Sequence, residues 1–422
     1  MTAAARHRAV ITGIGLLTPL GADAAGFFDA VCTGRTGLRR PPDTHPVAGI
    51  LDAAGFAPDI DPATVLPPSE ARRVDRFVVL AMAAADIALA DAGVEVGREA
   101  DPARTAVVLA NAFGGLGMFE AEAVARSERA REGSGHTAVT PYLLAGMLPN
   151  MATARIAIKH GVRGYSSTIS TACASGAYAV AEALRLIREG LADVVVCGGA
   201  EAPLLPTAAT TFRNSRALAG GWADPAEASR PFDRRRNGFV LGEGAGALVV
   251  ERAEHAAARG RPAYAEVAGW GVATDAYHPT APRADGTGAA SAMRLALADA
   301  GLAPADIGYV NAHGTGTTRG DAAEALAIRA VFGAHTPAVS SVKGVTGHLL
   351  AAAGAVEAAA TALALRRGVL PPTYNLDDPD PECDLDHVRK APREAAVRVA
   401  LSNSFAFGGH NVSLALAHPG GP

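Results

Sequence analysis

The stretch ALADAG occupies residues 88–93 and occurs again, unchanged, at residues 296–301. Each copy closes a segment whose apolar residues recur at helical spacing, which predicts an amphipathic helix in both places. The same ending on two helices far apart in the chain indicates an internal repeat. The repeat predicts a fold made of two related halves.

The segments that follow the two copies also correspond. TAVVLANAFGG comes after the first copy and IGYVNAHGTGT after the second, so that residues 111–114 parallel residues 311–314. Further on, AVAEALRLIREG from Ala179 resembles AVEAAATALALRRG from Ala355, and a Gly/Ser/Thr-rich turn precedes each. Three matches in the same order favour a duplicated βα unit. Equivalent loops of the halves should meet at a pseudo-twofold axis, with a site between them.

Composition places the chain in the α/β class. Its 422 residues exceed the usual size of a single hydrophobic core, so we expect two domains or one large domain of two parts. Hydrophobic residues make up 49% of the chain, aromatic residues only 5%, and there are 47 glycines, which is typical of helix layers packed on sheets. We place one half at residues 1–260 and the other at residues 261–422.

Charge and cysteine usage argue against several classes of function. A net charge of −4 and a pI near 6.3 argue against nucleic acid or an anionic membrane as a partner, because no basic field would hold either. No apolar span reaches 18 residues, and the four cysteines lack CxxC or zinc-site spacing, so we expect a cytoplasmic chain without disulfides. No dinucleotide, Walker or metal motif is present, so we expect no bound cofactor.

Cys173 in STISTACASGAY stands where a helix pattern begins that continues to Arg188. Unpaired N–H groups and the positive end of the helix dipole would then point toward its sulfur and lower the pKa of the thiol. Such a thiol can act as a nucleophile without a paired base. The alternative is a buried small apolar side chain, which is the commonest role of a free cysteine.

Two histidines stand in glycine-rich loops. His313 in YVNAHGTGT follows an apolar strand, where a loop exposes side chains at the strand's C-terminal end. His348 in SVKGVTGHLLAAAG mirrors Cys173 at the start of the repeat-related helix, so the two helix starts should face each other. Either histidine alone could be a structural ring, but the pair at repeat-equivalent positions favours function.

A lysine and a glutamate accompany these histidines. The chain has 38 basic residues but only three lysines, and one of them, Lys343, stands five residues before His348. The loop therefore uses a compact ammonium, or the lysine is there by chance. Glu324, on the helix after His313, is a candidate carboxylate partner.

The stretch SNSFAFGGHN near the C-terminus places Phe407 between Ala406 and Gly408. This loop would return to the sheet edge beside the loops described above, and its backbone N–H groups could form half of an oxyanion hole. A plain hairpin turn would satisfy the two glycines equally well.

Taken together, TACASGA, NAHGTGT, KGVTGHLLAAAGA and NSFAFGGHN resemble a β-ketoacyl-[acyl carrier protein] synthase of the elongating, synthase II type, in the thiolase superfamily. The resemblance covers nearly the whole chain. It implies the thiolase fold, with five layers αβαβα and two related halves, and a homodimer built through central strands. Gly316 in HGTGT is similar to the polyketide enzymes, which suggests the ketosynthase of a bacterial type II polyketide system.

The resemblance also implies a reaction. Cys173 would take the acyl chain from the phosphopantetheine thioester of a carrier protein, while backbone N–H groups of Cys173 and Phe407 hold the tetrahedral oxyanion. A malonyl carrier then enters, and His313 and His348 would stabilise the enolate oxygen as carbon dioxide leaves. The substrates are thus phosphopantetheine-linked acyl and malonyl carrier protein.

Further roles are carried over from the family to matching residues. Lys343 would pair with Glu324, and the hydroxyls of Thr315 and Thr317 would hydrogen-bond the pantetheine amides. Other residues are expected to line the acyl tunnel or to dock an acidic carrier protein. The tunnel residues are Met118 and Phe119, and the docking residues are Arg72, Arg73, Arg213 and Arg216.

Two residues depart from the pattern of the family, and alternatives stay open for the pathway, the dimer and the function. Ala406 stands where most elongating relatives have glycine, so the Cβ should restrict movement of the Phe407 gate, and His410 replaces the usual threonine. The pathway is that of a fatty acid or a polyketide, and the dimer is a homodimer or a heterodimer with a chain-length-factor-like subunit. A degradative thiolase or a non-catalytic partner subunit are the rival functions, and the Cys–His–His set disfavours both.

Overall fold

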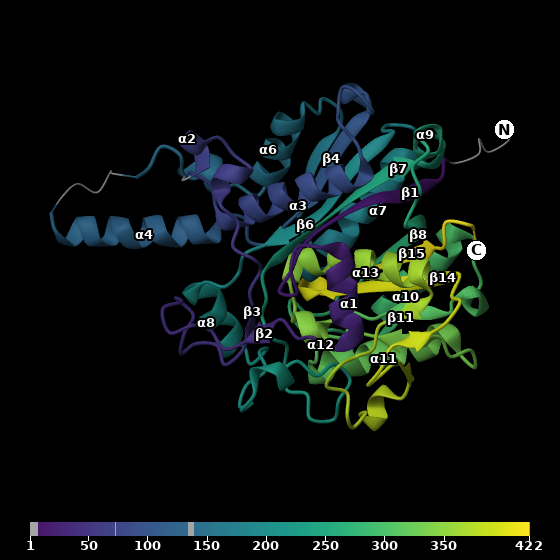
Figure 1. Cartoon of the computed structure of the whole chain (residues 1–422). Coiled ribbons are helices and arrows are strands. Elements are labelled where there is room, and N and C mark those ends of the chain that lie inside the picture. The colour runs from purple at the N-terminus through teal and green to yellow at the C-terminus, as the bar shows by residue number, and fades with distance from the viewer. Residues whose placement is uncertain (1–6, 72, 134–138, 422) are drawn as a thin grey trace.

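The computed structural model describes residues 7–71, 73–133 and 139–421. Within these residues, eleven strands join in one mixed sheet, in the order β12-β10-β9-β14-β15-β8-β1-β7-β6-β4-β5 (Figure 1). The bounds of these strands are β1 Ala9–Leu17, β4 Thr105–Ala110, β5 Ser166–Ile169, β6 Val194–Glu201, β7 Gly244–Arg252, β8 Ala265–Thr274, β9 Tyr309–Asn311, β10 Ala338–Ser340, β12 Asp386–His387, β14 Val399–Ala406 and β15 His410–Ala417.

The sheet consists of two half-sheets with the same topology. They touch where residues 9–11 of β1 pair antiparallel with residues 265–267 of β8. Outward from this contact one half runs β1-β7-β6-β4-β5 and the other β8-β15-β14-β9-β10, with the short strand β12 added beyond β10 in the second half. In each half the first two pairings are antiparallel and the next two parallel. The internal repeat predicted from ALADAG is therefore confirmed.

Helices complete the five layers αβαβα, as the resemblance implied. α3 (Arg76–Ala92) and α6 (Met151–His160) cover the outer face of the first half-sheet, and α10 (Thr287–Ala300) and α11 (Thr318–Phe332) cover that of the second. α7 (Ser175–Arg188) and α13 (Ala353–Arg367) lie between the half-sheets (Figure 1). The copies of ALADAG end α3 and α10, where Gly93 and Gly301 adopt the left-handed conformation with φ of 60° and 68°.

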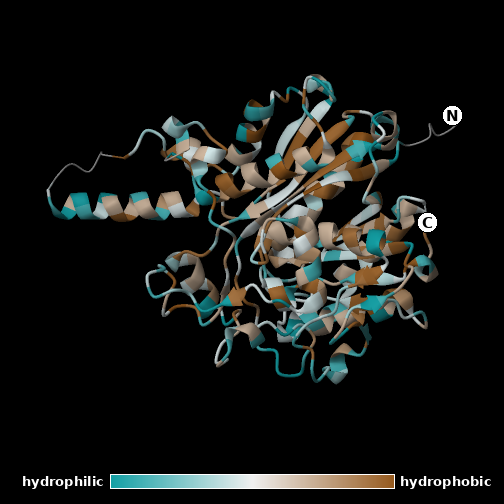
Figure 2. Cartoon of the chain, viewed as in Figure 1, coloured by the Kyte–Doolittle hydropathy of each residue, from teal (hydrophilic) through white to brown (hydrophobic). Residues whose placement is uncertain are grey.

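The two central helices cross at nearly backbone distance. A Cβ at Gly176 of α7 would lie 2.6 Å from the carbonyl oxygen of Ala351, and one at Gly354 of α13 would lie 2.5 Å from the amide nitrogen of Ala177. α13 is alanine-rich and buried from Ala353 to Leu365, because it packs against a sheet on each side. Figure 2 shows apolar residues concentrated in the strands and many of the hydrophilic residues in the loops at the surface.

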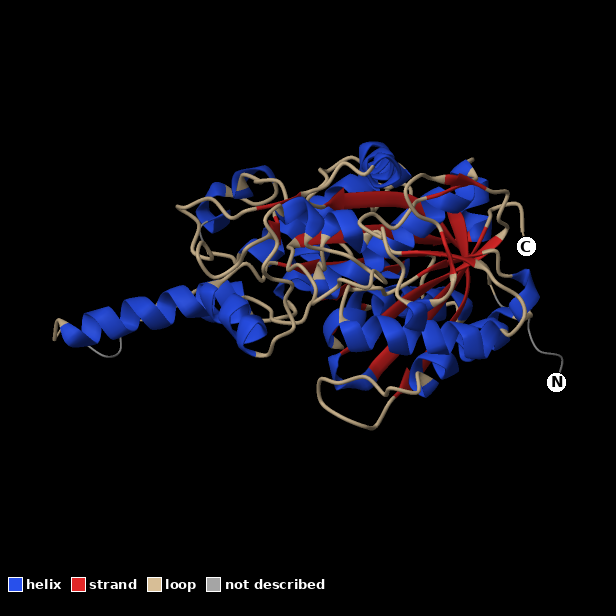
Figure 3. Ribbon diagram, turned by 90° about the horizontal axis from the view of Figure 1, so that it is seen from below, coloured by secondary structure: helices blue, strands red, loops and turns tan. Residues whose placement is uncertain are grey.

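The remaining elements surround this core. α4 (Leu116–Arg131) extends away from the body of the molecule, as Figures 1 and 3 show, and has no buried residue among those described. No helix in the described ranges is long and apolar enough to cross a membrane. The other helices are α1 Ala24–Thr33, α2 Pro68–Ala71, α5 Leu143–Met147, α8 Pro206–Asn214, α9 Ala253–Ala258 and α12 Lys343–Thr346, and the short strands are β2 Leu38–Arg39, β3 Ala54–Gly55, β11 Val369–Leu370 and β13 Arg393–Glu394.

Candidate active site

Equivalent 3-10 turns lead into α7 and α13. They begin at Ala172 and Leu350, which both have a φ of 49°, in the left-handed region that costs a non-glycine residue roughly 1–2 kcal/mol. The turns pack against each other, so the helix starts do face each other as predicted. Cys173 follows Ala172 and corresponds to Ala351. The prediction that His348 mirrors Cys173 is therefore wrong, because His348 precedes the second turn.

A cavity of about 690 Å³ lies between the two halves and reaches Cys173. The first half contributes Phe113, which follows β4, to the lining of this cavity. The second half contributes His313, which follows β9, and His348. The turn that contains Phe407 packs against the turn that contains Cys173. The structure thus brings the predicted nucleophile, both histidines and Phe407 into one cavity.

The two imidazole rings stand edge to face, with centroids 5.4 Å apart and an interplanar angle of 85°. Phe239 packs edge-on against His348 at 5.3 Å, and Phe405 lies 6.0 Å from His313. Burial lowers the pKa of both histidines well below 6.5, and the charge of Lys343 lowers both further. Both rings are therefore neutral at pH 7 and can donate a hydrogen bond without carrying charge.

Lys343 is buried beneath the histidines, but its partner differs from the predicted one. Its ammonium pairs with Glu357 of α13 and donates a hydrogen bond to the carbonyl oxygen of His313 at 2.5 Å. Burial raises the pKa of Glu357 to about 7, while the charge of Lys343 acts to lower it. The predicted pairing with Glu324 is wrong, because the fold brings α13 rather than α11 to the ammonium.

Glu324 instead holds the His313 loop from α11. Its two carboxylate oxygens accept the amides of His313 and Gly314 at 2.8 and 2.7 Å. One helical turn earlier, Asp321 accepts the amides of Thr315 and Gly316, both at 3.1 Å. Four consecutive amides thus bind two carboxylates on one helix, which fixes the loop. Sequence reasoning missed Asp321, although its spacing of three residues from Glu324 was a usable signal.

The thiol environment also differs from the prediction. Cys173 lies in the 3-10 turn rather than in α7, and burial raises the pKa of its thiol to about 12, although the charge of Lys343 acts to lower it. Desolvation of the thiolate therefore outweighs the favourable charge nearby. Ser175 braces the turn, since its hydroxyl accepts the amide of Thr171 at 2.7 Å and donates to the carbonyl of Ala172 at 2.6 Å.

Both halves of the chain match models of one protein family. Residues 6–256 match the family described as "Beta-ketoacyl synthase, N-terminal domain", and residues 264–377 match "Beta-ketoacyl synthase, C-terminal domain". The chain belongs to the β-ketoacyl synthase family. It is 43% identical over 426 residues to the 3-oxoacyl-[acyl-carrier-protein] synthase 2 of Rhizobium meliloti and 40% identical over 412 residues to that of Synechocystis sp., each alignment covering 97% of this chain and 98% of the relative.

Solved structures agree with this assignment. The ishigamide ketosynthase/chain length factor superposes with a TM-score of 0.89 at 34% identity, and a β-ketoacyl synthase from Burkholderia phymatum with 0.88 at 36%, each covering 98% of this chain and 99% of the other. A type II polyketide ketosynthase in complex with its acyl carrier protein gives 0.90 at 30% identity, with the same coverage. The synthase is an acyltransferase that catalyses β-ketoacyl condensation in fatty acid or polyketide biosynthesis.

The Phe407 turn begins directly after the last residue of β14. Ala406 ends β14 with φ of −130° and ψ of 160°, an extended conformation that any residue adopts, so its Cβ causes no strain here. Gly408 has a φ of 84° and does need to be glycine. Its amide donates to the carbonyl of Pro279 at 2.7 Å, which ties the turn to the loop after β8. His410 begins β15 directly after this turn.

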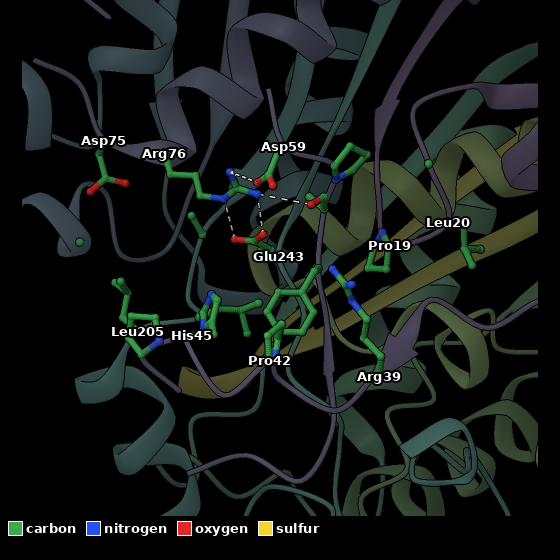
Figure 4. A pocket seen from close by; sticks show the side chains of 18 of the residues that line it. Pro19, Leu20, Arg39, Pro42, His45, Asp59, Asp75, Arg76, Leu205 and Glu243 are labelled. Atoms are coloured by element: carbon green, nitrogen blue, oxygen red, sulfur yellow. Dashed lines mark hydrogen bonds and ion pairs between the residues drawn. The ribbon is translucent and has the colours of Figure 1, made fainter. Parts of the chain in front are cut away.

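Thr315 and Thr317 line the cavity, with hydroxyls 3.1 Å apart, but the two predicted tunnel residues do not. Met118 lines a separate pocket of about 860 Å³, in which Arg76 pairs with Glu243 (Figure 4). Phe119 is half exposed on α4. Phe113 is a bulky residue that the first half contributes to the lining of the catalytic cavity. Its ring stands edge-on to that of Phe212, with centroids 6.2 Å apart. The sequence signal for Phe113 was the parallel between NAFGG at residues 111–115 and NAHGT at residues 311–315, in which Phe113 corresponds to His313.

The arginines predicted to dock a carrier are placed as follows. Arg72 lies outside the described residues. The guanidinium of Arg73 stacks over the Tyr142 ring at 3.7 Å, and Arg213 donates to the carbonyls of Gly49 and Ile50 at 3.2 Å. Arg216 is exposed, with a φ of 57°. Two of these four thus already have contacts within the chain.

Proposed function

We propose that the chain condenses a Cys173-bound acyl group with malonyl-[acyl carrier protein], which gives a β-ketoacyl carrier two carbons longer. The observation that carries this proposal is one cavity that contains a thiol, two neutral imidazoles and the Phe407 turn. The proposed domain division stays at residue 260, between β7 and β8.

Acyl transfer is the first proposed step. The sulfur of Cys173 attacks the thioester carbonyl of the acyl carrier, its proton passes to the departing pantetheine thiolate, and a new thioester forms on the enzyme. Backbone N–H groups of Cys173 and Phe407 would stabilise the tetrahedral oxyanion. Burial raises the pKa of the thiol, which favours loss of its proton as the carbon–sulfur bond forms.

Decarboxylation and bond formation complete the cycle. When the carboxylate of the malonyl group leaves as carbon dioxide, its bonding electrons move to form an enolate whose oxygen carries the charge. Neutral His313 and His348 would donate hydrogen bonds to this oxygen, which helps most in a site with little water. The carbanion then attacks the acyl-Cys173 carbonyl, and the thiolate of Cys173 leaves and takes up a proton from solvent, which restores the thiol. Lys343, paired with Glu357, holds the His313 loop by donating a hydrogen bond to the carbonyl oxygen of His313.

Substrate contacts follow from the cavity lining. Thr315 and Thr317 would hydrogen-bond the pantetheine amides of the carrier. Phe113 would limit the length of the acyl chain, in place of the predicted Met118 and Phe119. The proposed steps need no oxidant or reductant, because every electron pair moves between the substrates and the sulfur of Cys173.

Relatives form ketosynthase/chain-length-factor pairs and a complex with an acyl carrier protein. For this chain we propose an acyl carrier protein as partner, and a homodimer or a heterodimer with a chain-length-factor-like subunit. The support is β5, the last strand of its half-sheet, together with exposed apolar side chains on α4, α5 and α6 and just before β5. These are Phe119, Val124, Leu144, Ile158 and Tyr165. Four free cysteines support a cytoplasmic location.

The test is the intact-protein mass after incubation with a panel of acyl-carrier thioesters, followed by addition of malonyl carrier. We expect an adduct that requires Cys173, is absent in Cys173→Ala, and disappears as the longer β-ketoacyl carrier forms. Cys32→Ala, which removes a half-buried cysteine outside the cavity, should load normally. Loading only after a second synthase-like subunit is added would identify half of a heterodimer. No loading under either condition would contradict the proposal and favour a non-catalytic partner subunit.

A further inference from the structure

The rim of the catalytic cavity carries a positive charge that the proposed chemistry does not use. Among the described residues that line the cavity, Arg283 is the only lysine or arginine. The other titratable lining groups are the two neutral histidines, Cys173, and the carboxyl groups of Asp275 and Glu324. A permanent cation in this otherwise uncharged or acidic lining points to an anionic group on the substrate.

Arg283 lies at the opening of the cavity rather than at its base. It belongs to the loop between β8 and α10, in which Thr280 and Pro282 both line the cavity and are exposed. The side chain of Arg283 is itself 38% exposed. Cys173, in contrast, sits on the inner wall, beside the buried Lys343 network.

The backbone of Arg283 is held by the loops around the opening. Its amide donates to Asp275 Oδ2 at 3.1 Å, and Asp275 Oδ1 accepts the side-chain amide of Asn411 at 2.7 Å. The amide of Asp275 in turn donates to the carbonyl of Gly409, the last residue of the Phe407 turn, at 2.9 Å. The position of Arg283 is therefore coupled to the turn that borders Cys173.

The guanidinium is only partly engaged. Its Nε and Nη2 donate to the two oxygens of Asp285 at 3.2 and 2.7 Å, and Nε also lies 3.0 Å from the hydroxyl of Thr287. Tyr277 lies 5.8 Å from the guanidinium carbon. Within the described part of the chain, no hydrogen bond uses Nη1, so this nitrogen is available to a ligand at the opening.

We propose that Arg283 binds the phosphate of the phosphopantetheine arm of the carrier, which deepens the proposed function and rests on it. The phosphate is at the far end of the arm from the thioester. When the thioester reaches Cys173, the phosphate lies toward the opening. The malonyl carboxylate is the other anion available, but it must lose its charge beside the histidines, where a cation would stabilise the reactant and slow decarboxylation.

The test is inhibition of Cys173 acylation from an acyl carrier by 4′-phosphopantetheine and by pantetheine, which lacks the phosphate. In the wild-type enzyme we expect phosphopantetheine to inhibit at about tenfold lower concentration, as one charge-assisted contact at an exposed site provides. Arg283→Ala should abolish this difference and leave inhibition by pantetheine unchanged. Arg283→Lys should retain part of it.

Two controls separate this contact from general charge effects. Arg319→Ala removes an exposed arginine at the start of α11, next to the cavity-lining Gly320, and should keep the preference for phosphate. Arg283→Ala/Asp285→Asn removes the carboxylate that Arg283→Ala would expose, and should still lack the preference. A preference that survives Arg283→Ala, or is lost equally in Arg319→Ala, would overturn the proposal, as would its absence in the wild type.

Other outcomes identify other errors. If Arg283→Ala weakens loading from the carrier but leaves the phosphopantetheine preference intact, the arginine binds carboxylates of the carrier and the proposal is wrong. If the wild-type enzyme forms no acyl adduct from any carrier, the proposed condensation itself fails, which is a separate result from a change in inhibitor preference.

Discussion

The two halves of the molecule share a backbone plan and differ at the positions where chemistry takes place. Cys173 and Ala351 occupy equivalent turns, each entered through a residue with a φ of 49°. Phe113 and His313 occupy equivalent loops after β4 and β9. The first half thus supplies a nucleophile and an apolar wall, and the second supplies hydrogen-bond donors. The repeat gives both halves the same backbone, and different residues at matching positions give each half a different catalytic role.

The strongest test of this division transfers the nucleophile to the other half. In Cys173→Ala/Ala351→Cys the thiol stands in the equivalent turn, but Ala351 is fully buried and does not line the cavity. We expect acylation to fall more than about a thousandfold, as in Cys173→Ala alone. Intact-protein mass after incubation with an acyl carrier measures this. Acylation of the transferred thiol would contradict this expectation, because it would show that the conformation of the turn is sufficient for reactivity without access to the cavity.

The second test removes the donors that distinguish the second half. His313→Ala and His348→Ala should each slow decarboxylation of malonyl carrier roughly a hundredfold, because each removes a donor from the enolate oxygen. Acylation of Cys173 should change far less, since that step does not form the enolate. Release of carbon dioxide and the acyl-enzyme mass, measured on the same sample, separate the two steps. Equal loss of both would indicate a structural role for the rings.

The third test concerns the feature that both halves share. Gly176→Ala and Gly354→Ala each place a Cβ within 2.6 Å of backbone in the opposite central helix or the turn that leads into it. Each should lower the free energy of unfolding by about 2 kcal/mol, the usual result of overpacking a core. Denaturant titration measures this. A clear difference between the two variants would show that the helix crossing is less symmetric than the half-sheets.

The fourth and smallest effect is a shift in pH dependence. Burial lowers the pKa of both histidines well below 6.5 and the charge of Lys343 lowers both further, so decarboxylation should stay constant as the pH falls below 6.5. Lys343→Met removes that positive charge, which raises the pKa of both rings and moves the acidic loss of activity to higher pH. The pH profile of carbon dioxide release measures this. Lys343→Met/Glu357→Gln is the control: without Lys343 the pKa of the buried Glu357 rises further, so its carboxyl is protonated at acidic pH and the double variant should give the same profile as Lys343→Met.

Much of the site could be predicted from sequence because its residues lie in short local motifs. Cys173, His313, His348 and Phe407 each stand beside glycines or small residues that a loop at a strand end or a helix start requires. The family resemblance assigned their roles, and the structure brings all four to one cavity. The predictions that failed involve partners and surroundings rather than identities: Glu357 replaces Glu324 beside Lys343, and Phe113 replaces Met118 on the wall.

The sequence by itself determined the duplication, the α/β class and the reactive groups, because repeats, composition and motifs depend only on the order of residues. Tertiary structure alone decided which carboxylate meets Lys343, that the Cys173 thiol is desolvated, and that Arg283 reaches the rim of the cavity. Each of these depends on distances between elements far apart in the chain and on exclusion of water. Coulomb and desolvation energies vary with both, and the order of residues alone contains neither.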